Sequence, residues 1–429
     1  MSESTSSNAQ ALSARQLAAV SRKITFVLFI GQALASAVTV NVGTMGSIIA
    51  KDMMSARWAG LPSALITIGA ALASLLIGRL LNPLGRRLTL CLGLLLGLSG
   101  GAIASYAIYD QERFLLIPFI LGLVVMGGAR AAVDMSRFIA GEVTETHSRG
   151  RAISVVVWSA TIGAVLGPFL SPPLANLSEA LGIYRLTGIY AIAPIIFACI
   201  ALIFFFFLRP EPKDIAQAIG RIEKKAEDPN EVRPLSVIIR SPTVITAMTS
   251  MVIGHAVMVM LMVVTALHMG NHGHSEGNIA SVISSHTFGM FFFSILTGYL
   301  IDKFGRLPMI LAGAVILILA AFLAPATLHV IPLAFALFLL GLGWNFCFVG
   351  GSTLLSDTLN PLERANIQGL NNWLIGLVSA TGSLVSGFVY DSLSYAVMGV
   401  VGAVMSASLI VLCVWWVLRQ RKQPNTRLL

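Results

Sequence analysis

The chain has 429 residues, of which 56% are hydrophobic and only 11% are charged, and its mean hydropathy is +0.85. This composition excludes a soluble globular domain, in which about a quarter of the residues are charged. The net charge of +9 would suit a protein that binds nucleic acid, but the basic residues are spread along the chain in a pattern typical of membrane topology. The sequence is that of an integral membrane protein.

Twelve apolar runs are long enough to cross a membrane, which takes about 20 helical residues. Six of them cover residues 24–49, 60–81, 88–109, 114–140, 152–175 and 186–208. The other six cover residues 243–268, 278–300, 308–328, 331–357, 366–389 and 394–418. The sequence thus predicts an all-α integral membrane protein with 12 transmembrane helices in two six-helix bundles, 24–208 and 243–418.

Three polar segments flank and separate the two bundles. Residues 1–23 are rich in serine and are expected to form a tail, and residues 419–429 form a second, basic tail. Residues 209–242 carry a run of charges and are expected to be a solvated linker with a surface helix. A signal peptide cleaved near Ala37 is the alternative for the N-terminus, but cleavage there would leave eleven spans.

The basic residues indicate which loops are cytosolic. Of the 28 Lys and Arg residues, four lie in loops assigned to the outside and Arg130 lies within a span. The other 23 lie in alternate loops, at the helix ends beside them, and in both termini. Because positively charged loops resist translocation, they stay on the cytosolic side. We therefore expect a multi-pass protein of the inner (plasma) membrane with both termini and the linker in the cytosol.

A short motif occurs twice, as GRLLNPLGRR from Gly78 and, 220 residues later, as GYLIDKFGR from Gly298. Each copy joins the end of one span to the start of the next, where a glycine permits the bend and cations hold the loop in the cytosol. A repeat of this kind indicates two homologous halves. The residues assigned to this cytosolic gate motif are Gly78, Asn82, Gly85, Arg86 and Arg87 in the first copy, and Gly298, Asp302, Lys303, Gly305 and Arg306 in the second.

The paired motif resembles the loops between helices 2 and 3, and between helices 8 and 9, of the major facilitator superfamily. The resemblance covers nearly the whole chain. It implies a transporter, not an enzyme, which moves a small molecule by alternating access. The first copy departs from the family pattern, because Asn82 replaces the usual acid and Pro83 the usual base. Any charge relay is therefore expected to be weaker there than at Asp302.

The fifth span contains Gly163, Gly167 and Pro168, which resemble the helix-5 motif of drug/proton antiporters. Ser171 and Pro172 replace the glycines that close the family's motif. A Gly-Pro pair frees a backbone carbonyl and permits a kink. The function we expect is proton-coupled export of a small organic solute. Uptake of a nutrient or metal chelate is the alternative, since this spacing also occurs in facilitators, and a non-transporting membrane sensor is a third possibility.

Ionisable side chains inside a span are costly to bury and are therefore functional candidates. Arg130, Asp134 and Arg137 lie on one face of the fourth span, because they are spaced at i, i+4 and i+7. The family resemblance implies substrate binding or proton coupling for a buried Arg in this helix, and an acid near its cytosolic end that pairs with the Arg of the helix 2–3 loop. By position, Arg130 and Asp134 match. For Asp134 and Arg137, a structural gate is the favoured role.

The remaining candidates lie in the second half. His255 and His286 are in the middle of spans, and a histidine can exchange a proton near neutral pH. A neutral histidine that is hydrogen-bonded between helices is an equally good interpretation of either one. Trp344 and Asn345 in the tenth span, and Asn371 in the eleventh, are side chains suited to a binding cavity between the halves.

Other chemistry is not expected from this sequence. His272 and His274 lie in an external turn and could hold a transition metal, but no second pair of ligands follows, and solvated histidines are the favoured interpretation. The sequence contains no nucleotide-binding loop. We therefore expect no metal, no cofactor and no nucleic acid. The expected protein is a monomer that contacts a small-molecule substrate, protons and membrane lipid.

Overall fold

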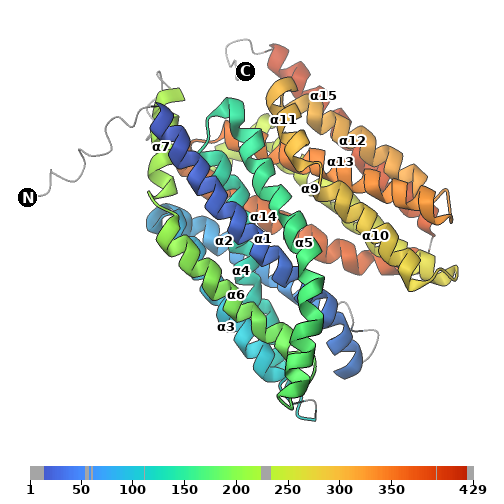
Figure 1. Cartoon of the computed structure of the whole chain (residues 1–429). Coiled ribbons are helices and arrows are strands. Elements are labelled where there is room, and N and C mark those ends of the chain that lie inside the picture. The colour runs from blue at the N-terminus through green and yellow to red at the C-terminus, as the bar shows by residue number, and fades with distance from the viewer. Residues whose placement is uncertain are drawn as a thin grey trace, which may run out of the picture.

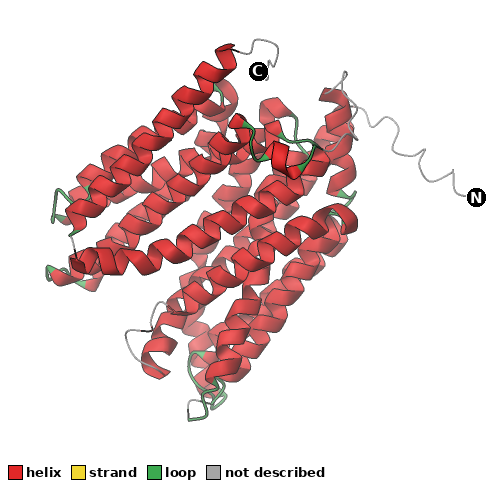
Figure 2. Cartoon of the chain, turned by 180° about the vertical axis from the view of Figure 1, so that it is seen from behind, coloured by secondary structure: helices red, strands yellow, loops and turns green. Residues whose placement is uncertain are grey.

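The computed structural model describes residues 14–53, 58, 61–110, 112–223, 233–392 and 394–422. Every regular element within these ranges is a helix (Figure 2). The helices run roughly alongside one another, and both ends of the described chain lie at the same end of the bundle (Figure 1). This placement fits an even number of membrane crossings.

The first half of the chain folds into six long helices and one short turn of 3-10 helix. They are α1 (Ala14–Met53), α2 (Leu61–Leu84), α3 (Arg86–Ala107), α4 (Leu116–Glu142), η3 (Thr146–Ser148), α5 (Arg149–Ala180) and α6 (Thr187–Phe207). Helix α1 begins ten residues before the predicted span. Residues 14–23, which the sequence analysis assigns to the tail, therefore belong to this helix, while residues 1–13 lie outside the described part of the chain.

The described parts of the linker and of the second half are also helical. The linker contains α7 (Pro212–Glu223) and α8 (Leu235–Ile238). The second half consists of α9 (Pro242–Asn271), α10 (Glu276–Phe291), α11 (Ser294–Phe304), α12 (Arg306–Leu323), α13 (Val330–Thr358), α14 (Pro361–Ser392) and α15 (Tyr395–Lys422). One face of α7 is apolar, and its Ile215 and Ile219 side chains are buried against the bundle.

Ten helices of the described chain are long and apolar enough to cross a membrane. The other two predicted spans correspond to α14 and to the pair α10 and α11. Helix α14 has 32 residues but carries polar side chains in its buried part. The eighth span is divided at Phe292 and Phe293, where α10 ends and α11 begins. Counted this way, the fold has the twelve membrane helices expected from the sequence.

Glycines at the start of the two motif copies let helices from opposite halves touch. A Cβ on Gly78 would lie 2.8 Å from the carbonyl oxygen of Ala365 in α14, and one on Gly298 would lie 2.7 Å from that of Gly150 in α5. Both distances are well below the ~3.5 Å at which non-bonded atoms pack favourably. The motif therefore begins with glycine because the two halves meet at this position.

The loop glycines of the motif have a different role. Gly85 has φ 81° and Gly305 has φ 93°. These values lie in the left-handed region, where a residue with a Cβ is strained. Each glycine thus turns the chain directly from one helix into the next, α2 into α3 and α11 into α12.

The helix-5 motif forms the contact between α5 and α1. A Cβ on Gly163 would lie 2.3 Å from the carbonyl oxygen of Ala33, so the backbones of the two helices approach closely there. The carbonyl oxygen of Gly167 accepts a hydrogen bond from Nδ2 of Asn41 at 2.6 Å. Ser171 in turn donates to Oδ1 of Asn41 at 2.6 Å. These contacts account for the two glycines by helix packing.

Candidate functional site: a cavity and a gate between the halves

A cavity of about 270 Å³ lies between the two halves. Its volume is near the lower end of the range of about 300–1,000 Å³ that is usual for ligand pockets. Five of the residues singled out in the sequence line this cavity, namely Arg130, Asp134, Arg137, His255 and Trp344. The first three come from α4 and the others from α9 and α13, so both halves contribute to the wall.

Arg130 and Asp134 are one helical turn apart, yet within the described part of the chain no ion pair joins them. Nη1 of Arg130 donates to the hydroxyl of Thr67 at 3.4 Å, which is longer than the usual 2.7–3.2 Å. Asp134 uses its backbone carbonyl to accept from Nη1 of Arg137 at 2.9 Å. Both charged side chains therefore retain binding capacity that a solute in the cavity can use.

Arg137, by contrast, joins the two halves, although its buried Nε has no hydrogen-bond partner among the described residues. Its guanidinium carbon lies 4.4 Å from the ring centroid of Phe138 and 4.2 Å from that of Phe348. Its Nη2 donates to Oδ1 of Asn372 in α14 at 2.7 Å. Trp344 stacks on Phe348 with the ring centroids 4.5 Å apart. The rings and the guanidinium form one continuous column from α4 to α13, which we call the cation–π column.

Trp344 also connects the column to His255. Its Nε1 donates to Nδ1 of His255 at 2.9 Å. Since Nδ1 accepts this bond, the imidazole is neutral and its proton sits on Nε2. Phe291 packs edge-on against Trp344 at 5.9 Å between ring centroids, and it also lines the cavity. The second half thus presents an aromatic wall to the cavity, whereas the first half presents charged and hydroxyl groups.

Asn345 lies outside the cavity wall and stabilises the break between α10 and α11. Its Nδ2 donates to the carbonyl oxygen of Met290 at 2.7 Å and to Oγ of Ser294 at 2.6 Å. A break in a membrane helix leaves carbonyls without their usual partners, and these must be satisfied inside the protein. The side chain of Asn345 is fully buried.

The other two candidates from the second half are also outside the cavity wall. Nδ1 of His286 bonds the carbonyl oxygen of Leu337 at 3.0 Å, which ties α10 to α13. Nδ2 of Asn371 lies 3.5 Å from the sulfur of Met251, between α14 and α9. Both side chains are completely buried. Their contacts are those of polar groups that join helices.

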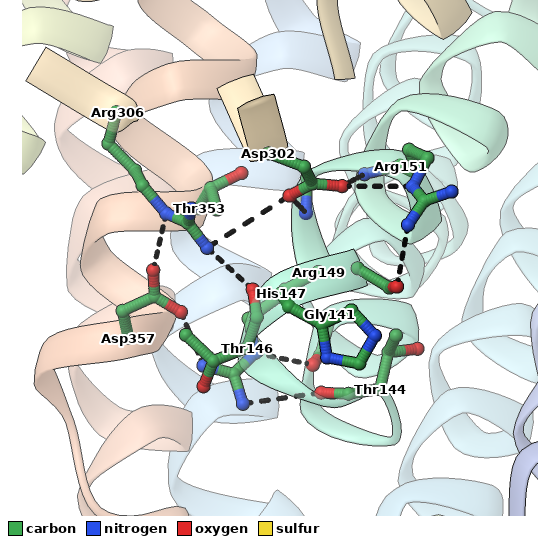
Figure 3. A network of polar contacts seen from close by, with 12 residues as sticks. Gly141, Thr144, Thr146, His147, Arg149, Arg151, Asp302, Arg306, Thr353 and Asp357 are labelled. Carbon is green, nitrogen blue, oxygen red and sulfur yellow. Dashed lines mark hydrogen bonds and ion pairs between the residues drawn. The ribbon is translucent and has the colours of Figure 1, made fainter. Parts of the chain in front are cut away.

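A network of ion pairs joins the halves at the end of the bundle that holds the chain termini (Figure 3). Asp302 accepts hydrogen bonds from the backbone N–H groups of Gly150 and Arg151, each at 3.0 Å, and from Nε of Arg151 at 3.2 Å. The N-terminal amides of a helix attract a negative charge because they have no partner within the helix. We call the network formed by Arg149, Arg151, Asp302, Arg306 and Asp357 the gate network.

Asp357 holds the other side of the gate network. It accepts from Nε of Arg306 at 2.7 Å and also pairs with Nη1 of Arg149. Nη2 of Arg306 donates to the carbonyl oxygen of Thr146 at 2.6 Å. Arg149 and Thr146 belong to the first half, and Arg306 and Asp357 to the second. Every one of these contacts therefore contributes to holding this end of the bundle together.

The first motif copy contains a related but less charged arrangement. Nε of Arg86 pairs with Glu142 at 3.1 Å, and both side chains are 1% exposed. The acid that pairs with the helix 2–3 arginine is therefore Glu142 and not Asp134, which corrects the expectation from the sequence. Asn82 makes the contact between halves, since its Nδ2 donates to the carbonyl oxygen of Leu362 at 2.6 Å. This contact is neutral, whereas the one at Asp302 is ionic.

Lys303 and Arg87 lie outside the gate network. Nζ of Lys303 is 5.3 Å from the ring centroid of Phe304, and the side chain is exposed. Arg87 lies over the ring of Phe205 at 5.6 Å. Each is a cation beside an aromatic ring of its own half.

The linker is attached to both halves beside the gate. Glu211 accepts from the backbone N–H of Arg86 at 2.5 Å, and Lys213 donates to the carbonyl oxygen of Asn82 at 2.7 Å. Beyond the undescribed stretch, Arg233 pairs with Glu363 at 2.7 Å. Burial alone would raise the pKa of Glu363, but the hydrogen bonds from Arg233 outweigh it and hold that pKa below its ordinary value.

Comparison with known proteins places the chain in the family that its repeated motif resembles. The Major Facilitator Superfamily model matches residues 28–278 and 250–428. The chain is 32% identical over 398 residues to the MFS-type transporter YdeG of Bacillus subtilis. This alignment covers 92% of this chain and 92% of the relative. It is 29% identical to the riboflavin transporter RfnT of Brucella anthropi, over 90% of this chain and 95% of the relative.

Solved structures extend the similarity to the fold. The structure of the proton:xylose symporter XylE, bound to 6-bromo-6-deoxy-D-glucose, matches with a TM-score of 0.76 at 16% identity. The match covers 91% of this chain and 95% of that chain. Together with the two family-model matches, which overlap and between them span residues 28–428, these relationships identify the chain as a member of the major facilitator superfamily of membrane transporters, and not as an enzyme.

Proposed function

We propose that the protein moves a small organic solute across the inner membrane by alternating access, and that protons drive the movement. The observation that carries this proposal is the arrangement of the cavity and the gate network. The cavity is lined by both halves, and the gate network joins the halves at the end that holds the termini. With the termini in the cytosol, the gate network joins the halves on the cytosolic side of the cavity in this conformation.

Asp134 is our candidate for the coupling group. It is the carboxylate that lines the cavity, and within the described residues no ion pair occupies it. A carboxylate in such a place can take a proton from one side of the membrane and release it on the other. The acids of the gate network, in contrast, are held by arginines. Asp134 therefore carries the proton in our proposal, and Arg130 binds the solute.

The direction of transport is the finer part of the proposal. Export in exchange for protons rests on the resemblance of the helix-5 motif, but Gly163 and Gly167 are accounted for by packing against α1. Uptake together with protons is supported by the similarity to RfnT, whose name gives riboflavin as its solute, over nearly the full length of both chains. We propose uptake as the function and keep export as the second candidate.

Accumulation of labelled solutes in cells tests this function. A strain that lacks the gene is compared with the same strain complemented by the wild-type gene, over a panel of small organic solutes at two external pH values. Uptake predicts that complementation raises accumulation of at least one solute, and more so at the lower external pH. Lower accumulation on complementation would favour export, and no change for any solute would contradict a transport function.

A further inference from the structure

We infer that the solute of the central cavity is an aromatic anion, with one or two planar rings and a carboxylate or a group of similar charge. This inference rests on the proposed transport function and assigns the substrate class of the same cavity. Four observations carry it: the balance of charge in the cavity, the state of its two arginines, the aromatic wall and the volume.

The charge of the cavity favours an anion. Arg130, Arg137 and Asp134 are the charged side chains among its described lining residues, which leaves one positive charge in excess. His255 adds none, because its Nδ1 accepts a hydrogen bond from Trp344 and the ring is neutral. An arginine retained in a membrane interior needs an anionic or polar partner to offset its desolvation. The cavity is therefore net positive whether Asp134 is ionised or protonated, which favours an anionic solute.

The anion binds at Arg130, because Arg137 is enclosed by two rings and already joins the two halves through Asn372. Arg137 is held between two rings and bonds Asn372 and the carbonyl oxygen of Asp134. Arg130 makes one long hydrogen bond to Thr67 and otherwise has donors to spare. A guanidinium binds a carboxylate through two parallel N–H···O bonds. Arg130 can supply this pair of donors without breaking the contact between the halves.

The opposite wall recognises an aromatic ring. Phe291, Trp344 and Phe348 line the cavity from α10 and α13, and their rings pack against one another. Aromatic rings prefer offset-stacked or edge-on neighbours, which aliphatic side chains cannot provide. The volume of about 270 Å³ limits the solute to a compact molecule. A charged group on α4 that faces an aromatic wall on α13 thus fits a flat solute with its charge at one end.

The charge of the solute also fits uptake with a proton. The charged and titratable groups that share the cavity with Asp134 are Arg130 and Arg137 of α4 and His255 of α9. An anion bound at Arg130 lies one helical turn from Asp134, so an ionised Asp134 repels it. A proton on Asp134 removes this repulsion, and proton and anion therefore bind cooperatively. A cation would instead compete with the proton for Asp134, which is the condition for exchange.

Four compounds of nearly equal size separate these features by titration calorimetry on the purified, detergent-solubilised protein. The probe is 2-naphthoate, and its comparisons are the neutral 2-naphthamide, the cationic 2-naphthylmethylammonium and the non-aromatic decalin-2-carboxylate. We expect 2-naphthoate to bind roughly tenfold or more tightly than the amide and the cation, as expected when a charged pair in the cavity is lost. The decalin acid should bind several-fold more weakly than 2-naphthoate.

Variants at the two charged positions complete the test. Arg130→Gln should weaken 2-naphthoate by roughly tenfold or more, while Arg79→Gln, which removes an exposed arginine of α2, should leave its affinity unchanged. Asp134→Asn should tighten 2-naphthoate several-fold, because it removes the repelling charge. If Arg130→Gln does not fold, Arg130→Lys serves in its place and should lose the advantage of 2-naphthoate over its amide, since lysine lacks the planar pair of donors.

Each outcome decides the inference. Equal or tighter binding of the amide or the cation would overturn the anionic class, and equal binding of the decalin acid would overturn the aromatic class. Failure of all four compounds to bind would overturn both. If another class of solute accumulates in complemented cells while 2-naphthoate does not bind, the substrate class fails and the transport function stands. If 2-naphthoate binds but no solute is moved, the transport function fails instead.

Discussion

Asp302 of α11 caps the N-terminus of α5 across the interface between the halves, where it accepts the backbone N–H of Gly150 at 3.0 Å. The cap is unusual in that the carboxylate comes from the other half of the molecule and not from the residue before the helix. The first N–H groups of a helix have no partner within it, and they carry a partial positive charge. When this end of the cavity opens, the carboxylate must leave these groups, so the cap itself opposes opening.

Asp302→Asn should therefore shift the protein toward the conformation that is open to the cytosol. The amide is neutral, so it weakens both the cap and the contact with Arg151. A coupling of 1–3 kcal/mol is typical of such switches, and the population should shift by roughly fivefold or more. Labelling of a cysteine placed at Ser356, which is fully buried in α13, reports the opening from the cytosolic side. The background for this experiment lacks the four native cysteines.

A matched substitution provides the control for this prediction. Glu179→Gln removes an acid from an exposed ion pair with Arg185, far from the gate network. It should leave the labelling of residue 356 unchanged. Equal labelling in Asp302→Asn and in the unsubstituted background would mean that Asp302 serves only to anchor the loop.

Loss of one partner should destabilise the protein more at the buried ion pair between Arg86 and Glu142 than at an exposed ion pair. Both side chains are 1% exposed, so Glu142→Gln removes the carboxylate that pairs with a buried guanidinium. Such a loss typically destabilises a protein by about 3–5 kcal/mol. The exposed pair Arg185 and Glu179 should contribute about 0–1 kcal/mol. Melting temperatures of the two purified Glu→Gln variants should therefore fall by clearly different amounts, and equal values would contradict this account of the pair.

The cation–π column should stabilise the junction between the halves. Phe348→Leu removes one of the two rings that enclose Arg137. A desolvated cation–π contact contributes about 2 kcal/mol, so the melting temperature should fall by a few degrees. Phe335→Leu, at an exposed position on the same helix, is the control and should have little effect. If the column does not stabilise the junction, the two variants will have equal melting temperatures.

The topology can be tested by reporter fusions. An enzyme that is active only in the periplasm should be inactive when fused after Leu429 and active when inserted after Gly273, in the turn between α9 and α10. The expectation follows from the 23 basic residues assigned to the cytosolic side. Strong activity of the fusion at Leu429 would contradict an even number of spans with cytosolic termini.

The sequence was sufficient to predict the features that follow from local chemistry. Apolar runs gave the membrane helices, and the repeat that begins at Gly78 and Gly298 indicated two related halves. The positions of Gly85 and Gly305 marked sharp turns, as their positive φ angles show. The start of α1 is not apparent from the sequence, because residues 14–23 are polar enough to resemble a tail, whereas burial of Leu17 and Ser21 against the rest of the bundle favours a helix.

The partners of individual side chains were harder to predict, because they depend on contacts between distant segments. Arg86 and Glu142 are 56 positions apart, and Arg306 and Asp357 are 51 apart. The internal repeat could have suggested both pairs, since they occupy corresponding places in the two halves. The use of Asn345 at a helix break could not be foreseen, because residues 290–297, which contain the break, include neither glycine nor proline.

The central claim, proton-coupled transport through the cavity with Asp134 as the coupling group, is tested most directly by solute-driven proton movement in proteoliposomes. Vesicles that enclose a pH-sensitive dye are loaded with wild-type protein, with Asp134→Asn, or with Glu179→Gln as the control. A panel of small organic anions, cations and neutral compounds is then added outside. We predict that at least one solute acidifies the interior with the wild type and the control but not with Asp134→Asn. Proton entry that persists in Asp134→Asn, or the absence of solute-driven proton entry for the wild type, would contradict the claim.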